Sequence, residues 1–266
     1  GFVVSCGLVP RYSDIDAGAM AAAAVDEAVR NAICSGVDPA KMAGCDNFCW
    51  PDPILSEKTP DGKFKLAQLV RANRELERAC RGYRVPCISG KDSMKNDATI
   101  NGTKISVPPT LLFSLIGNHK DVRNAISSDF KTVGDIIYLV GETHQELGAS
   151  ELAFMLYDET NGKSGIGGQV PQIDATRNLA LYRSLTNSMS NGLVASAHDC
   201  SDAGLAAALT ECCFGCDSGA VLEISNLFNN NKDLDIWGAL FGESLGRILV
   251  SVKPQDSQLF EESMMN

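Results

Sequence analysis

Hydrophobic and polar positions follow two different periods along the chain, and together these periods predict alternating strands and helices. Short apolar runs typical of strands occur at residues 2–6, 41–48, 85–88, 110–117, 134–142, 193–198, 220–224 and 247–252. Apolar residues at helical spacing occur between them, at residues 15–36, 64–82, 150–157, 174–192, 201–215 and 233–243. This alternation predicts an α/β or α+β fold class.

Helix-capping residues, glycines and a polar segment mark the boundaries between elements and between domains. Ser13, Asp14 and Asp16 can cap the start of the alanine-rich helix over residues 15–36, and Gly36 can end it. A glycine-rich loop is expected over residues 162–172. Polar residues 119–134 separate two strand-rich blocks, so we expect two domains, residues 1–122 and 123–266. Because the sequence opens inside a predicted strand, we expect a piece of a longer protein whose second domain is truncated at its end.

The composition of the chain argues against several classes of function. The formal net charge of -10 argues against binding to nucleic acid or to an anionic membrane surface. No apolar stretch reaches the roughly 18 residues of a membrane span. Ten cysteines lack the paired spacing of a zinc site or disulfide framework, which favours buried free thiols. We therefore expect a reduced, cytoplasmic protein without nucleic-acid or membrane partners.

Two polar groups follow predicted strands of the first block. Gly90, Lys91 and Ser93 come after the strand at residues 85–88, where a cation and a hydroxyl could hold a phosphate and its magnesium. A polar turn explains these residues equally well. Asp46 comes near the end of the preceding strand, at the sheet edge where ligand sites concentrate, although an Asx turn is the more frequent explanation.

Within the alanine-rich helix, Glu27 and Asn31 lie four residues apart and project from one face. Their oxygens are suitable ligands for Mg²⁺, which takes few protein ligands beside water and phosphate. Asp26 and Arg30 have the same spacing and can pair, and a solvated face is the explanation that spacing alone favours.

A fourth group lies where the strand at residues 193–198 meets the following helix. Ser201 or Asp202 can cap that helix, and the free N–H groups at its start favour an anion. Asp199, just before the cap, could hold a metal beside a phosphate. A plain capped helix with His198 in the core fits equally well. Together the four groups suggest phosphate and magnesium.

Four motifs in order, "DEAVRN", "SGKDSM", "HDCSDAGLAAAL" and "LFGESLGRILV", resemble phosphoribosylformylglycinamidine synthase over nearly the whole chain. The resemblance is to the second of the two halves of that enzyme that are similar to aminoimidazole ribonucleotide synthase. It implies an N-terminal α/β domain whose sheet pairs with another copy, followed by a C-terminal α/β sandwich domain.

The resemblance also implies chemistry: ATP phosphorylates the amide oxygen of formylglycinamide ribonucleotide, and glutamine-derived ammonia then attacks. Positions matching Asp46, Gly90 and Ser93 contact ATP and substrate in a composite site. Shorter family members carry asparagine where this chain has Lys91, and lysine does not ligate a metal. An auxiliary ATP/ADP site is implied, in which Glu27, Asn31 and Asp199 match the Mg²⁺ ligands and Ser201 matches a nucleotide contact.

The implied partners are the first synthase half and the glutaminase domain or subunit, neither of which has a counterpart in this sequence. We therefore expect the chain to be inactive alone and to form a homodimer in isolation. Two alternatives stay open. One is a non-catalytic nucleotide-binding or scaffold module. The other is a stand-alone relative such as aminoimidazole ribonucleotide synthase or selenophosphate synthetase, although the glycine-rich N-terminal phosphate loop of those enzymes is absent from this sequence.

Overall fold

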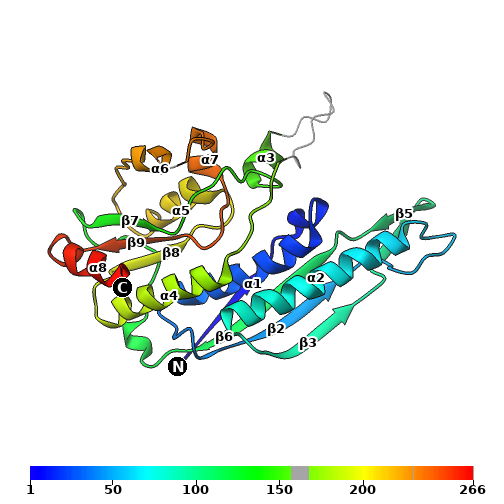
Figure 1. Cartoon of the computed structure of the whole chain (residues 1–266), viewed down its shortest axis with the longest axis horizontal. Coiled ribbons are helices and arrows are strands. Elements are labelled where there is room, and N and C mark those ends of the chain that lie inside the picture. Colours follow the sequence, from blue (N-terminus) through cyan, green and yellow to red (C-terminus); the bar gives the residue numbers. More distant parts are fainter. Residues whose placement is uncertain (157–167, 230, 266) are drawn as a thin grey trace.

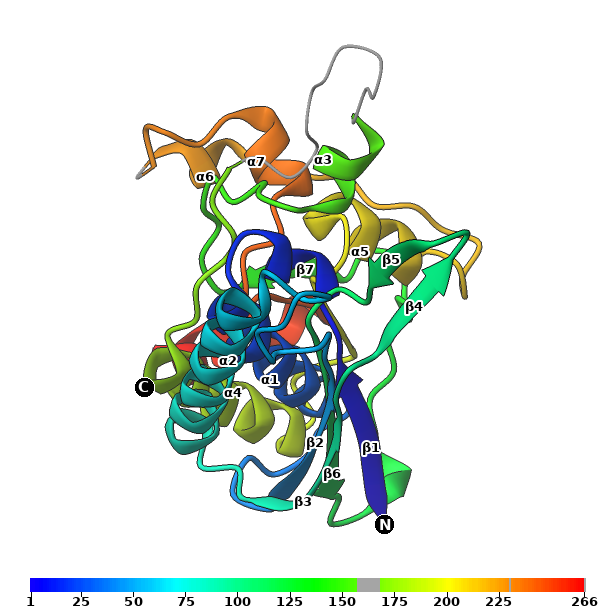
Figure 2. The same ribbon diagram turned by 90° about the vertical axis from the view of Figure 1, so that its right-hand side faces the viewer.

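The first part of the chain forms a four-stranded sheet with two long helices on one of its faces (Figure 1 and Figure 2). The computed structural model describes residues 1–156, 168–229 and 231–265. The strands are arranged in the order β1 (Phe2–Gly7), β6 (Thr110–Asn118), β2 (Met42–Cys49) and β3 (Cys87–Ser93), and the helices are α1 (Ala17–Cys34) and α2 (Gly62–Tyr83). Only β2 and β3 are parallel. A separate hairpin, β4 (Asp97–Ile100) and β5 (Thr103–Ser106), extends from this sheet.

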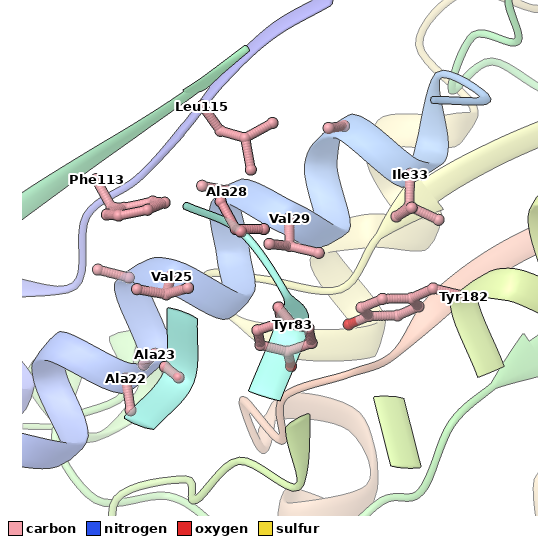
Figure 3. Close-up of a cluster of buried hydrophobic side chains, with 14 of the residues drawn as sticks. Ala22, Ala23, Val25, Ala28, Val29, Ile33, Tyr83, Phe113, Leu115 and Tyr182 are labelled. Atoms are coloured by element: carbon pink, nitrogen blue, oxygen red, sulfur yellow. The ribbon is translucent and has the colours of Figure 1, made fainter. Parts of the chain in front are cut away.

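Helix α1 is the centre of the core, because most of its small side chains are buried. The Asp16 carboxylate accepts hydrogen bonds from the backbone N–H groups of Gly18 (2.8 Å) and Ala19 (3.1 Å), which caps the helix. Small side chains let neighbouring elements approach closely: a methyl group added at Gly7 of β1 would lie 1.9 Å from the Ala24 carbonyl oxygen. The helix packs between the sheet and α2, with Phe113 of β6 against it (Figure 3).

The second part of the chain is a three-stranded antiparallel sheet with helices on both faces (Figure 1). The strand order is β7 (Ile136–Val140), β9 (Ile248–Val252) and β8 (Ser196–Asp199). All five residues of β9 are buried because both of its faces are covered. The helices are α3 (Glu151–Met155), α4 (Ala175–Ser190), α5 (Gly204–Cys212), α6 (Ser225–Asn229), α7 (Ile236–Phe241) and α8 (Ser257–Met264). Short 3-10 turns occupy Pro10–Asp14, Val122–Asn124 and Pro254–Asp256.

The structure confirms the predicted mixture of sheets and helices, but one of the predicted strands is wrong. Residues 220–224 form no strand, and the Val221 side chain is 99% exposed. These residues line a pocket together with Ile137 and Leu205. Of the expected loop at residues 162–172, residues 162–167 lie outside the described part of the chain. Within the part that is described, no helix is long and apolar enough to cross a membrane.

Candidate functional site

The first group of predicted site residues lies inside two neighbouring strands. We predicted a loop after residues 85–88, but β3 continues through Ser93, and Asp46 likewise lies within β2 rather than near its end. The polar residues of β3 are compatible with a strand because β3 is at the sheet edge, where parallel pairing to β2 supplies the hydrogen bonds. Neither the polar turn nor the Asx turn is present.

Asp46 and Gly90 are register partners and meet on one face of the sheet. A methyl group added at Gly90 would lie 2.6 Å from the nearer Asp46 carboxylate oxygen, so any side chain at this position would force that carboxylate to move. Partial burial and, to a lesser degree, the nearby Asp92 raise the pKa of Asp46. The face carrying Asp46 is turned toward α2, because Asp46 shares a pocket of about 620 Å³ with residues of that helix.

Lys91 and Ser93 are placed differently. Successive side chains of a strand point to opposite faces, which directs Lys91 away from the face of Asp46 and Gly90. Lys91 is a register partner of Asn47 and is exposed. The Ser93 hydroxyl lies 3.0 Å from Asn96 Nδ2, which donates a hydrogen bond to it. The structure therefore brings together two of these four residues and places the other two on the opposite face of the same strand pair.

The second group assembles where α1 meets the end of β8. Arg30 Nη2 donates a hydrogen bond of 2.9 Å to the Ser201 hydroxyl, which in turn donates to the Asp199 carboxylate. Arg30 Nε lies 3.8 Å from Asp199 and has no hydrogen-bond partner, although it is buried. On the same helix, the Glu27 carboxylate accepts a 2.8 Å hydrogen bond from the backbone N–H of Leu8. Asn31, one turn beyond Glu27, has an exposed side chain.

The two carboxylates of this group have opposite proton affinities. Burial raises the pKa of Glu27 to about 7, against the opposing effects of Arg30 and the Leu8 hydrogen bond. Burial would raise the pKa of Asp199 as well, but the hydrogen bond from His198 and the charge of Arg30 outweigh it and hold that pKa at about 2. Asp199 is therefore ionised at neutral pH, whereas Glu27 gains or loses its proton near neutral pH.

The predicted solvated face of α1 is wrong, because the Asp26–Arg30 ion pair forms but is buried. Asp26 is fully buried and Arg30 is 1% exposed. Beside Arg30, the Asp26 carboxylate accepts hydrogen bonds from the hydroxyls of Tyr83 and Tyr182, the Asn178 side-chain amide and the backbone N–H of Gly246. This group, which we call the Asp26 network, joins α1 and α2 to the second part of the chain.

The expected cap of helix α5 is also wrong. Neither Ser201 nor Asp202 caps it; the helix starts after Ala203, which has a φ of 55°. The Ala203 N–H donates instead to the Glu243 carboxylate at 3.0 Å. The same carboxylate accepts from the backbone N–H of Glu151 (2.8 Å) and from the Tyr12 hydroxyl (3.0 Å). Glu243 lies in the fourth quoted motif, but nothing in that motif indicates which helix it would cap.

The oxygen donors near Arg30 fit Mg²⁺ in kind, since carboxylates and amides are hard ligands. In the described residues, however, no group of three or more histidine, cysteine, aspartate or glutamate side chains is placed to hold a metal ion. Phosphate oxygens would therefore have to complete the coordination of an ion held by Glu27 and Asp199.

Comparison with known proteins agrees with this two-part architecture. Residues 1–107 match the N-terminal domain model of AIR synthase related proteins, and residues 132–264 match the C-terminal domain model. The chain belongs to this family.

Solved structures of several proteins have the same fold as this AIR synthase related chain. Thermotoga maritima PurL complexed with FGAR is 17% identical, with a TM-score of 0.75, over 99% of this chain and 40% of that one. The same protein with ATP has a TM-score of 0.70 at 17% identity, over 98% and 37%. Hydrogenase maturation protein HypE in complex with ATP has a TM-score of 0.63 at 14% identity, over 100% and 72%. The chain thus spans about two-fifths of the PurL length.

Proposed function

We propose that this chain is the second AIR-synthase-like half of a phosphoribosylformylglycinamidine synthase, an ATP-dependent carbon–nitrogen ligase, with residues 1–122 and 123–266 as its two domains. The whole enzyme would phosphorylate the amide oxygen of formylglycinamide ribonucleotide and replace it with glutamine-derived ammonia. The chain would supply one wall of the composite site. Support comes from the ordered motifs and from the fold it shares with PurL, whose structures include complexes with FGAR and with ATP.

In this proposal the β2–β3 pair contributes to the composite site from both of its faces. Asp46, next to the space that Gly90 leaves open, would accept hydrogen bonds from ATP or the substrate. Lys91 and Ser93 present a cation and a hydroxyl on the other face, where the first half of the synthase would bring its own residues. A cation of this kind stabilises the charge that builds up on a phosphoryl group during its transfer.

The observation that carries the proposal is the group around Arg30. Glu27 and Asp199 come from segments 172 residues apart, and they flank one buried arginine beside the Ser201 hydroxyl. We propose that Glu27, Asn31 and Asp199 hold Mg²⁺ and that Ser201 contacts a nucleotide phosphate at an auxiliary ADP or ATP site. When bound, the ion would neutralise phosphate charge. Arg30 would keep Asp199 ionised and ready to bind it.

The partner would cover the free face of the first sheet. Helices α1 and α2 occupy one face only (Figure 2), and the other carries exposed apolar residues: Phe2 (72%), Val4 (75%) and Ile116 (41%). Val4 and Ile116 are register partners on neighbouring strands, and Phe2 lies two residues before Val4, so these three side chains share one face. We propose that the first synthase half covers this surface in the enzyme and that a second copy covers it in the isolated chain.

The test is a calorimetric titration of the chain with ADP, with and without Mg²⁺. We expect binding that requires Mg²⁺ and that Glu27→Ala weakens roughly tenfold or more, because even groups that only orient metal ligands have effects of this size. Glu57→Ala is the matched control, since Glu57 is an exposed carboxylate in a loop. Binding that does not require Mg²⁺, or that Glu27→Ala does not weaken, would contradict the auxiliary site. Turnover of formylglycinamide ribonucleotide by the chain alone would contradict the composite site.

A second candidate is a stand-alone member of the family, and the fold that the chain shares with HypE in its ATP complex is the observation that favours it. In that case two copies would build complete sites from their own residues. ATP hydrolysis by the purified dimer, without any added subunit, would favour this candidate over the synthase half.

A further inference from the structure

Two thiols face each other at the rim of the pocket beneath α2. Cys80, in the last turn of α2, and Cys87, the first residue of β3, have their sulfur atoms 3.7 Å apart. Cys87 is exposed and Cys80 is partly buried, so the pair is open to small molecules from one side. Both residues line the same pocket as Asp46.

The backbone holds this pair in place. Helix α2 ends at Arg84, which adopts a left-handed conformation with a φ of 58°. The Val85 N–H donates a 2.9 Å hydrogen bond to the Cys80 carbonyl oxygen, and the Gly44 N–H donates one of 2.9 Å to that of Pro86. The short connection from Cys80 to Cys87 is therefore fixed at both ends. A disulfide needs its sulfur atoms about 2.05 Å apart, and rotation of the two side chains can supply the remaining approach.

We propose that Cys80 and Cys87 form a reversible disulfide, a modification site whose oxidant is a small peroxide. The Cys87 sulfur attacks one peroxide oxygen and the O–O bond breaks. The leaving hydroxide takes the thiol proton, giving a sulfenic acid and water. The Cys80 sulfur then attacks the Cys87 sulfur, the S–S bond forms and the S–O bond breaks. Hydroxide leaves with the Cys80 proton as a second water. Two thiols lose two electrons, and one hydrogen peroxide becomes two waters.

Exposure and charge set the order of these steps. Burial, with a smaller effect from neighbouring Cys87, raises the pKa of the Cys80 thiol well above its usual value. Burial raises the pKa of Cys87 too, but Cys87 is the more exposed of the two and is therefore the thiol that reacts first. Asp46 of β2 and Glu77 of α2 disfavour a thiolate here, whereas Arg81 and Arg84 line the same pocket with positive charge. The first step should therefore be slow at neutral pH and accelerate as the pH rises.

The bridge would tie the start of β3 to the last turn of α2. Gly90 lies three residues further along β3, beside Asp46, and the disulfide would fix the wall of their shared pocket of about 620 Å³. The oxidised and reduced forms would therefore differ in how freely the edge strand of the first sheet can move. This consequence concerns the geometry of the chain itself and does not depend on which reaction the chain serves.

Peptide mapping tests the proposal directly. The 266-residue chain is treated with a molar excess of hydrogen peroxide, remaining thiols are blocked, and the chain is digested with trypsin without reduction. We expect residues 79–81 linked to residues 85–91, with the link removed by dithiothreitol and eight of the ten thiols still titratable. Cys80→Ser and Cys87→Ser should each abolish the link. Cys6→Ser, which removes another exposed thiol, should retain it.

A second measurement distinguishes two thiols that the fold holds together from two cysteines that are merely close in the sequence. Equilibration with reduced and oxidised dithiothreitol should show the bridge resisting reduction roughly tenfold better in the folded chain than in urea, because folding holds the thiols together. A bridge of equal stability in urea, or linkage of Cys87 to another cysteine, would overturn the proposal. Because neither measurement involves nucleotide, failure here leaves the Mg²⁺–ADP test standing, and failure of that test leaves the disulfide standing.

Discussion

The proton affinity of Glu27 makes a quantitative prediction about stability. Its pKa of about 7 in the folded chain compares with an ordinary value of 4.5. Each pKa unit corresponds to about 1.4 kcal/mol, so the difference amounts to about 3 kcal/mol. The folded state holds this proton more tightly than the unfolded state does. Below about pH 4.5 Glu27 therefore does not destabilise the folded chain. As the pH rises from there, Glu27 increasingly lowers the free energy of unfolding, and the loss is complete above about pH 7.

The perturbation is Glu27→Gln, which removes the titrating proton but keeps an oxygen that can accept from the Leu8 N–H. We expect the variant to be more stable than the parent above neutral pH, by up to about 3 kcal/mol, and equal to it at pH 4. For a chain of this size the gain corresponds to an increase in Tm of roughly 5 °C or more. Urea denaturation and thermal melting at a series of pH values measure the difference.

Two results would refute this reasoning. If the difference in free energy of unfolding between parent and variant stays the same across the pH series, Glu27 does not titrate as its burial implies. A variant that is less stable than the parent above neutral pH would mean that the ionised carboxylate is already compensated by its neighbours. Mg²⁺ supplies a further check, because it should stabilise the parent above neutral pH and have little effect on Glu27→Gln if the ion binds there.

Three further predictions concern packing and assembly. Gly90→Ala should destabilise the chain by about 1–3 kcal/mol in urea denaturation because its methyl group would overlap Asp46, whereas Gly219→Ala, with open space around it, should not. Asp26→Ala should cost about 3–5 kcal/mol by leaving the buried Arg30 without its main partner; a loss below about 1 kcal/mol would contradict the importance of the network. Val4→Lys should convert the expected dimer to a monomer in sedimentation without lowering Tm appreciably, and an unchanged dimer would place the interface elsewhere.

The long helices could be predicted from the sequence because their signals are local. Asp16 caps α1 through its own neighbours, and apolar spacing defines α2. Strand β3 was predicted too short because the residues after Ile88 are polar and exposed, and only pairing with β2 makes them a strand. Residues 220–224 have the pattern of a strand, but their place beside β7 is decided by tertiary packing.

The candidate site was predictable only in part, for the same reason. The helical spacing of Glu27 and the strand end at Asp199 made both residues candidates, and the family resemblance favoured them over a solvated face. The structure places them near one arginine. Spacing alone could not reveal that Arg30 is buried, because burial depends on elements far away in the sequence. The role of Glu243 was equally hidden, since it accepts hydrogen bonds at the starts of two helices from N–H groups that lie 92 and 40 residues earlier.

The Asp26 network has a consequence for the order in which the chain is made. Asp26 is synthesised well before three of its hydrogen-bond donors, because Asn178, Tyr182 and Gly246 follow it by 152, 156 and 220 residues. During synthesis the nascent first domain therefore carries a carboxylate and a guanidinium in its main helix without most of their final partners. The first domain should remain loosely packed until Gly246 has emerged, and the two domains should reach their native state together.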